Sequence, residues 1–168
     1  SWFPLLLGLI ILVVILNQVL FTSAATKDEF AIPNNVVSAD DWQAPDISAL
    51  PNNEEGNRIR YGRELIVNTA LFFGPKGKLG AITNGMNCQN CHVDGGIVPF
   101  AGCFSAVGST YPRYRDRSGR IESIEFRVND CMLRSLNGHV IDSSGPEMQA
   151  MVAYLKWLGK DVPKNKKP

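Results

Sequence analysis

Two cysteine thiols lie three positions apart in this sequence, at Cys88 and Cys91, and His92 follows the second of them directly. Thiols at this spacing can bond to the two vinyl groups along one edge of a porphyrin, and the adjacent imidazole can then bind the iron. Half of a zinc site or a thioredoxin-like redox pair would use the same two cysteines. The 168 residues hold no second Cys-x-x-Cys pair and no His-x-x-x-His pair to complete a zinc site, and no βαβ pattern surrounds the motif. The motif therefore predicts one covalently bound haem c, with His92 as an axial ligand.

The second axial position of the iron has several candidate ligands. Cys131 lies on the apolar face of a predicted helix, together with Ile124 and Val128. A buried cysteine is more often a small apolar residue than a ligand, so the helical pattern by itself leaves the choice open. Met148 is nearest to the position that a methionine ligand takes in ordinary c-type cytochromes, before the last helix, although it already lies inside that helix. The other candidates are Met86, Cys103, Met132, His139 and Met151.

Three predicted helices would position these ligands. Residues 58–73 carry apolar side chains at helical spacing, residues 123–136 do the same and end at an Asn-Gly pair, and residues 146–158 begin with proline and end at a glycine. Gly62 in the first of them costs little where a second helix approaches closely. No segment shows the alternation of a convincing strand. The pattern predicts a mainly α fold, a class I cytochrome c-like haem domain whose long loops are tolerated because the haem fills part of the core.

The first 26 residues carry no charge, whereas charged residues are frequent afterwards and the net charge is only +1. This balance gives no indication of nucleic-acid binding. Trp2 to Phe21 would form a helix about 30 Å long, which matches the hydrocarbon core of a bilayer. A cleaved signal peptide is the alternative, but the apolar run is longer than the ~7–15 residues of a signal's core. We therefore predict a single N-terminal transmembrane helix at the bacterial inner membrane, with the haem domain in the periplasm, where thioether attachment takes place.

These features divide the chain into four predicted parts. Residues 1–22 form the transmembrane anchor, residues 23–56 a periplasmic linker, residues 57–162 the cytochrome c domain and residues 163–168 a basic tail. Prolines and paired asparagines punctuate the linker, but its scattered apolar residues are too many for a fully solvated chain. Some of them are therefore expected to pack on the haem domain or on a partner. The tail is expected to be solvated, or to dock on an acidic partner or on anionic headgroups.

From about Tyr61 to Trp157 the sequence resembles the haem domains of the thiosulfate dehydrogenase family of c-type cytochromes, relatives of the sulfur-oxidising Sox cytochromes. The segments that carry the resemblance are residues 84–92, 111–119, 127–138 and 146–158. In that family the cysteine of a segment like Arg-Val-Asn-Asp-Cys, found here at 127–131, is the distal ligand of the catalytic haem. The resemblance thus implies that Cys131 binds the iron opposite His92, in agreement with its place on the helical face.

Two features depart from the family pattern. Members usually carry two haems, whereas this sequence has a single Cys-x-x-Cys-His motif, so a partner would have to replace the second haem. Cys103 stands where we expect no cysteine from the family pattern. It could be a buried thiol or an attachment point. It could also form a disulfide with Cys131, which is reasonable in an oxidising compartment and would remove Cys131 from the iron.

Arginines are concentrated in the second half of the domain. Four of them fall within eight positions and two more follow in the next predicted helix: Arg113, Arg115, Arg117, Arg120, Arg127 and Arg134. Guanidinium groups could hold a sulfur oxyanion over the haem, or they could pair with the haem propionates, which is the simpler explanation. We predict that haem is bound through Cys88, Cys91, Arg117 and Arg127, and that His92 and Cys131 are the iron ligands.

Together these features predict a membrane-anchored monohaem c-type cytochrome that transfers electrons in the periplasm, to a redox protein partner or within a membrane respiratory complex. The alternative is an enzyme that joins two thiosulfates to tetrathionate, or does the reverse, on the Cys131 side of the haem. A single haem and an anchor favour electron transfer, while the Cys131 helix and the arginines favour the enzyme. The sequence names neither electron donor nor acceptor. An anionic thiolate ligand would stabilise ferric iron and set a lower potential than a methionine ligand.

Overall fold

The computed structural model describes residues 2–23 and 42–166, which fall in two units. The first unit holds helix α1, Phe3–Ser23, and the second holds the other described helices and strands. Among the described residues, no helix is long and apolar enough to cross a membrane. The structure therefore does not support the predicted transmembrane helix. Much of the predicted linker, residues 24–41, lies outside the described residues.

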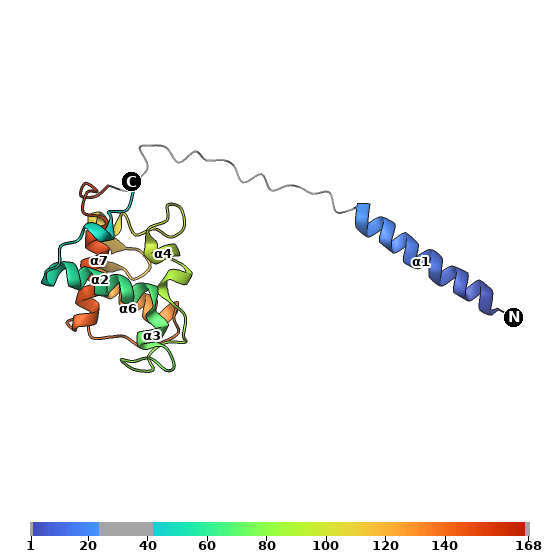
Figure 1. The fold of residues 1–168 in the computed structure, drawn as a ribbon, viewed down its shortest axis with the longest axis horizontal. Helices are drawn as coiled ribbons and strands as arrows, with labels where there is room; N and C mark the ends of the chain where they lie inside the picture. Colours follow the sequence, from blue (N-terminus) through green and yellow to red (C-terminus); the bar gives the residue numbers. More distant parts are fainter. Residues whose placement is uncertain (1, 24–41, 167–168) are drawn as a thin grey trace. The chain divides into compact units, whose positions relative to one another are not determined.

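Four helices form the frame of the second unit: α2 (Glu54–Val67), α3 (Thr69–Phe73), α6 (Ile124–Arg134) and α7 (Pro146–Leu158), all visible in Figure 1. α2 begins before the predicted residue 58, because the Asn53 side chain accepts a hydrogen bond from Gly56 N at 2.9 Å and caps the helix. It ends at Val67, since Asn68 leaves helical geometry and separates α2 from α3. The mainly α prediction is confirmed.

Two short strands, β1 (Arg113–Arg115) and β2 (Arg120–Glu122), form an antiparallel hairpin in which Arg113 lies opposite Glu122. The expectation that the domain contains no strand is wrong. Each strand has only three residues, which is too few for an alternating pattern to be recognised in the sequence. The turn closes through a hydrogen bond from Gly119 N to Arg115 O at 2.9 Å, and Gly119 takes a left-handed φ of 65° that suits glycine.

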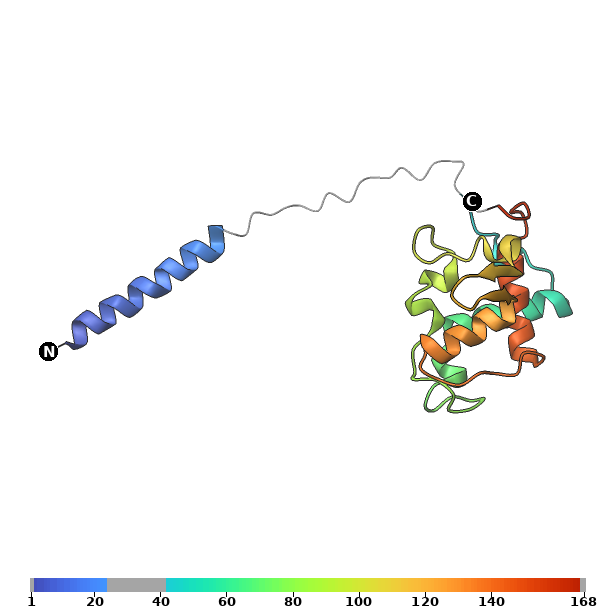
Figure 2. The same ribbon diagram turned by 180° about the vertical axis from the view of Figure 1, so that it is seen from behind.

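Short helical turns connect these elements. They are η1 (Ile47–Ala49), η2 (Cys88–Asn90), α4 (Val93–Gly96) and α5 (Val107–Thr110). The haem-attachment motif therefore spans η2 and the residues that lead into α4. Viewed from behind, α6 lies in front of α2 and α7 (Figure 2).

α2 and α7 pack across each other in the centre of the domain (Figures 1 and 2). At Gly62 the crossing is so close that a Cβ atom would lie 2.0 Å from the carbonyl oxygen of Ala150. The close helix approach expected at Gly62 is confirmed. Around this crossing the buried core includes Ile59, Leu65, Ile66, Met148, Met151, Val152, Leu155 and Leu158.

Replacing Gly62 by valine should lower the free energy of unfolding by about 2–3 kcal/mol, because the new side chain must push the α7 backbone away. Chemical denaturation of the haem-loaded chain measures this loss. As a control, Arg58→Ala on the exposed side of the same helix should change the stability by no more than about 0.5 kcal/mol. Equal stabilities of the two variants would contradict the close crossing at Gly62.

Segments outside the four main helices also pack onto the domain. Trp42, Ala44, Ile47 and Leu50 precede α2 and contact the core, so this part of the predicted linker is packed on the domain. The basic C-terminal segment is held as well. Lys164 Nζ donates to Tyr111 O at 2.7 Å, and Ser109 Oγ donates to Lys166 O at 2.6 Å. The predicted tail is thus tied to α5 and its neighbours rather than simply solvated.

Candidate haem site

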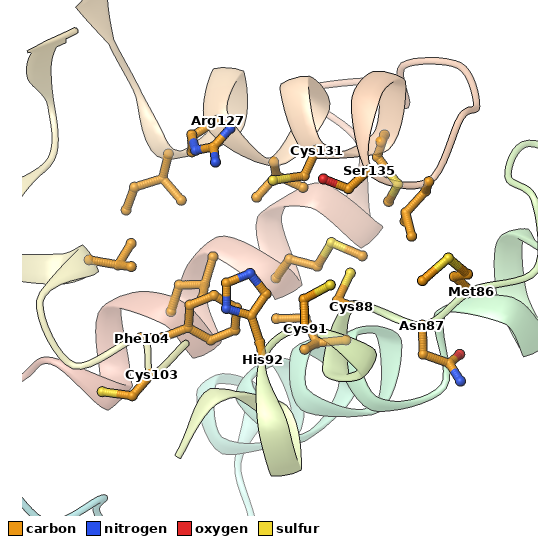
Figure 3. A pocket seen from close by; sticks show the side chains of 18 of the residues that line it. Met86, Asn87, Cys88, Cys91, His92, Cys103, Phe104, Arg127, Cys131 and Ser135 are labelled. Carbon is orange, nitrogen blue, oxygen red and sulfur yellow. The ribbon is translucent and has the colours of Figure 1, made fainter. Parts of the chain in front are cut away.

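A cavity of about 220 Å³ lies between the Cys-x-x-Cys-His segment and helix α6 (Figure 3). Apolar side chains from α2, α5, α6, α7, the loop before α5 and the residues just after α6 form most of its wall. They are Ile66, Phe104, Val107, Ile124, Val128, Met132, Leu136, Met151 and Leu155. The cavity is thus suited to a flat, largely apolar group.

Hydrogen bonds hold the Cys-x-x-Cys-His segment against α3. Cys88 N donates to Thr69 Oγ1 at 3.0 Å, and Ala70 N donates to Asn87 Oδ1 at 2.8 Å. The η2 turn then brings Cys88 and Cys91 to the same side of the cavity, and both line it (Figure 3). Two thiols on one edge of an apolar cavity are the arrangement that thioether attachment requires.

The ring of His92 is fixed by two contacts. Its Nδ1 donates to the carbonyl oxygen of Gly102 at 2.5 Å, and the ring stacks on Phe104 with centroids 4.2 Å apart. The other ring nitrogen, Nε2, points toward α6 across the cavity (Figure 3). A histidine ligand commonly donates from one nitrogen to a backbone carbonyl and binds metal with the other. His92 is therefore oriented as an iron ligand would be.

The opposite wall is one face of α6. Arg127, Cys131 and Ser135 follow each other at intervals of four residues, so all three side chains face the cavity from the same side of the helix (Figure 3). Cys131 lies across the cavity from His92. Arg127 is the only arginine or lysine among the cavity-lining residues. The structure thus brings His92, Cys131 and Arg127 to one site.

Burial changes the pKa of Cys88, on one wall of the cavity, and of Cys131, on the opposite wall. It raises the pKa of Cys88, and a hydrogen bond with Thr69 opposes this effect. Burial also raises the pKa of Cys131, where the positive charge of Arg127 opposes the change and the negative charge of Asp130 adds to it. Arg127 therefore favours the anionic form that a thiolate ligand must adopt.

The other candidates for the distal ligand differ in whether they line the cavity. Met148 and His139 do not line the cavity, and Met148 is fully buried in the core beside α2. Met86, Met132 and Met151 do line it. Cys131 remains the cysteine on the wall that faces His92.

Cys103 also lines the cavity, but its sulfur points away from both His92 and Cys131 (Figure 3). Its Sγ lies 3.0 Å from Ser105 Oγ. All four cysteines are free thiols, so the disulfide considered between Cys103 and Cys131 is not formed.

The predicted arginine cluster does not converge on the cavity. Arg117 lies exposed in the turn of the β1–β2 hairpin and does not line the cavity, whereas Arg127 does. The remaining hairpin arginines have separate partners: Arg113 lies over Tyr111, Arg115 lies 3.8 Å from buried Glu122, and Arg120 stacks on Phe126. Of the six arginines in the predicted cluster, Arg127 is the one that lines the cavity.

The residues present fit haem c. Two free thiols lie on one edge of an apolar cavity, the oriented imidazole of His92 follows them, and the thiol of Cys131 lies on the opposite wall. Haem bound here would supply a one-electron acceptor to whatever reaches the α6 side.

Comparison with known proteins agrees with this geometry. The SoxA/TsdA cytochrome c domain family matches residues 79–163, about half of the chain. The chain belongs to this family. A cytochrome c domain of the SoxA/TsdA type carries covalently attached haem c, as the motif predicts.

Two relatives of this SoxA/TsdA domain are named thiosulfate dehydrogenase. The protein from Psychrobacter arcticus is 37% identical over 71% of this chain and 35% of its own length. The protein from Allochromatium vinosum is 34% identical over 71% of this chain and 44% of its own length. The chain therefore spans less than half the length of either relative.

A solved structure shares the fold. Thiosulfate dehydrogenase (TsdBA) from Marichromatium purpuratum superposes with a TM-score of 0.69 and 25% identity, over 78% of this chain and 29% of the other. The SoxA/TsdA domain thus makes up a part of a larger protein in these relatives.

Several site residues gave no signal in the sequence. Gly102 and Phe104 fix the His92 ring. Gly102 has a left-handed φ of 69°, and a Cβ atom at this position would lie only 2.5 Å from the carbonyl oxygen of Cys91, so a larger residue would clash. Ser135, by contrast, is placed on the same helical face as Cys131 by the spacing of residues 123–136, and it does line the cavity.

Proposed function

We propose that this SoxA/TsdA domain is the haem domain of a thiosulfate-oxidising enzyme. The observation that carries the proposal is the α6 wall, where Cys131 and Arg127 stand side by side opposite the oriented His92. The names of the relatives support it, since those from Psychrobacter and Allochromatium are both thiosulfate dehydrogenases. This reverses the order of the two functions predicted from the sequence.

The proposed reaction joins two thiosulfate dianions through a new sulfur–sulfur bond to give tetrathionate, and it releases two electrons. Arg127 would attract and orient the negative substrate, because a guanidinium group offers several charge-assisted hydrogen bonds. The apolar walls would keep water from the reacting sulfur atoms. Since a haem takes up one electron at a time, an acceptor outside this domain must remove electrons between the two transfers.

Electron transfer without sulfur chemistry is the second candidate. The single Cys-x-x-Cys-His motif in the 168 residues favours it, because one haem is enough to take an electron from one partner and pass it to another. A location at the bacterial inner membrane, with a respiratory complex as partner, stays a prediction. Carbonate extraction tests one part of it, whether the uncharged Trp2 to Phe21 segment anchors the chain in a membrane.

Thiosulfate turnover tests the proposal. The haem-loaded chain, mixed with thiosulfate and ferricyanide, should reduce two ferricyanides for each tetrathionate formed. Sulfate replaces thiosulfate in the control, since it has the same charge but no outer sulfur to oxidise. If the domain accepts electrons from dithionite yet forms no tetrathionate from thiosulfate, the electron-transfer function is the correct one.

A further inference from the structure

Asp130 lies on α6 beside the cavity wall and bridges two arginines. One carboxylate oxygen accepts a hydrogen bond from Arg127 Nη1 at 2.7 Å, and the other accepts one from Arg134 Nε at 2.6 Å. The Asp130 side chain is only 16% exposed. Both of its oxygens are therefore engaged by guanidinium groups at short distance.

Helix stabilisation does not by itself explain this bridge. A carboxylate four residues before a cation, as in Asp130 and Arg134, stabilises a helix by about 0.2–0.5 kcal/mol. The pair with Arg127 has the reverse order, with the cation first, which is the less favourable one. Arg127 nevertheless makes this bond, and of the two arginines only Arg127 lines the cavity.

Arg127 has hydrogen-bond donors left over. A guanidinium group carries five N–H donors. Within residues 42–166, Asp130 is the only hydrogen-bond partner of the Arg127 guanidinium group. The remaining donors stand at the wall of a mostly apolar cavity, next to Cys131. Because the Arg127 side chain is 36% exposed, it could turn outward to solvent if Asp130 did not hold it.

We infer that Asp130 is a positioning residue, which holds Arg127 so that its free N–H groups bind a doubly charged sulfur oxyanion beside Cys131. Arg134 bonds the second carboxylate oxygen from outside the cavity, and its side chain is 56% exposed. The inference rests on the proposed function for the identity of the oxyanion, thiosulfate. Binding of an oxyanion requires no turnover, however, so the two can be tested separately.

Charge and position have opposite consequences at Asp130. In Asp130→Asn the carboxylate loses its negative charge, so the α6 wall becomes more positive and would attract a dianion more strongly. The same substitution weakens the bond that orients Arg127, because a neutral amide is a poorer partner for guanidinium than a carboxylate. If position matters more, the variant must bind the anion less tightly although its net charge is more favourable.

The experiment is calorimetric titration of the haem-loaded chain with inorganic sulfate and with thiosulfate, at a fixed ionic strength near 0.15 M. Asp130→Asn should bind both anions about tenfold more weakly than the wild type, the cost of weakening one charge-assisted contact. Asp130→Glu, which keeps the charge, should recover part of the affinity. Arg134→Gln removes one positive charge outside the cavity and should change the affinity by no more than about twofold.

Thiosulfate turnover gives a second readout. Asp130→Asn should raise KM by more than it lowers kcat, and thermal unfolding of each variant shows that the domain remains folded. Wild-type affinity or tighter binding in Asp130→Asn overturns the inference, as does a loss in Arg134→Gln equal to that in Asp130→Asn, or no binding of either anion by the wild type. Normal sulfate binding without tetrathionate formation overturns the proposed function and leaves the positioning role intact.

Discussion

Cys131→Ala should abolish the low-spin thiolate signature of the ferric haem while the haem stays covalently attached. Cys131 faces His92 across the cavity and is the cysteine on that wall, so alanine leaves the iron without its sulfur ligand. Thiosulfate turnover should fall by on the order of 10³-fold or more, as expected when a group at the reacting centre is removed. Electron paramagnetic resonance of the ferric protein and the ferricyanide assay measure the two effects.

Two further variants make the result specific. Cys103→Ala is the matched control, because the Cys103 sulfur also borders the cavity but points away from His92; its spectrum should equal that of the wild type. Cys131→Met offers a neutral sulfur at the same position and should keep a low-spin haem with a higher potential. An unchanged spectrum in Cys131→Ala would show that another residue, such as Met86, Met132 or Met151, is the distal ligand.

The elements that the sequence predicted correctly depend on local, repeated signals. The helix from Pro146 to Leu158 has the same bounds in the structure, because a proline at its first turn and a glycine after its last residue mark both ends. The Cys-x-x-Cys-His motif gave the attachment segment, since that chemistry fixes the spacing of its residues. Gly62 predicted a close helix approach because a glycine within a helix leaves space for a neighbouring backbone, and the structure places the Ala150 carbonyl there.

What the sequence did not predict depends on contacts between distant residues. The orientation of His92 is set by Gly102 and Phe104, ten or more residues away, through a backbone carbonyl and a ring face that carry no sequence pattern. The arginines were predicted as one cluster because they are close in sequence. In the hairpin, Arg113, Arg115 and Arg120 instead have separate partners, and Arg117 and Arg127 end at different places.

Arg127→Gln should lower kcat/KM for thiosulfate by about 10²-fold to 10³-fold, the usual loss when a donor to developing or bound negative charge is removed. Among the described residues that line the cavity, Arg127 is the only arginine or lysine, so it is the side chain there that can offset the charge of a dianion. The kcat/KM of Arg127→Lys should lie between those of the wild type and Arg127→Gln, because lysine keeps the charge but loses the planar fork of donors. The ferricyanide assay at several thiosulfate concentrations separates the effects on kcat and KM.

The matched control for Arg127→Gln is Arg134→Gln, on the same helix and also paired with Asp130 but 56% exposed and outside the cavity. It should keep kcat/KM near the wild-type value. The two roles considered for Arg127 also differ in their effect on the haem. If Arg127 paired only with the haem propionates, its loss would shift the reduction potential and leave sulfate binding as it was. Loss of sulfate binding together with turnover, at an unchanged reduction potential, therefore supports Arg127 as the anion-binding residue.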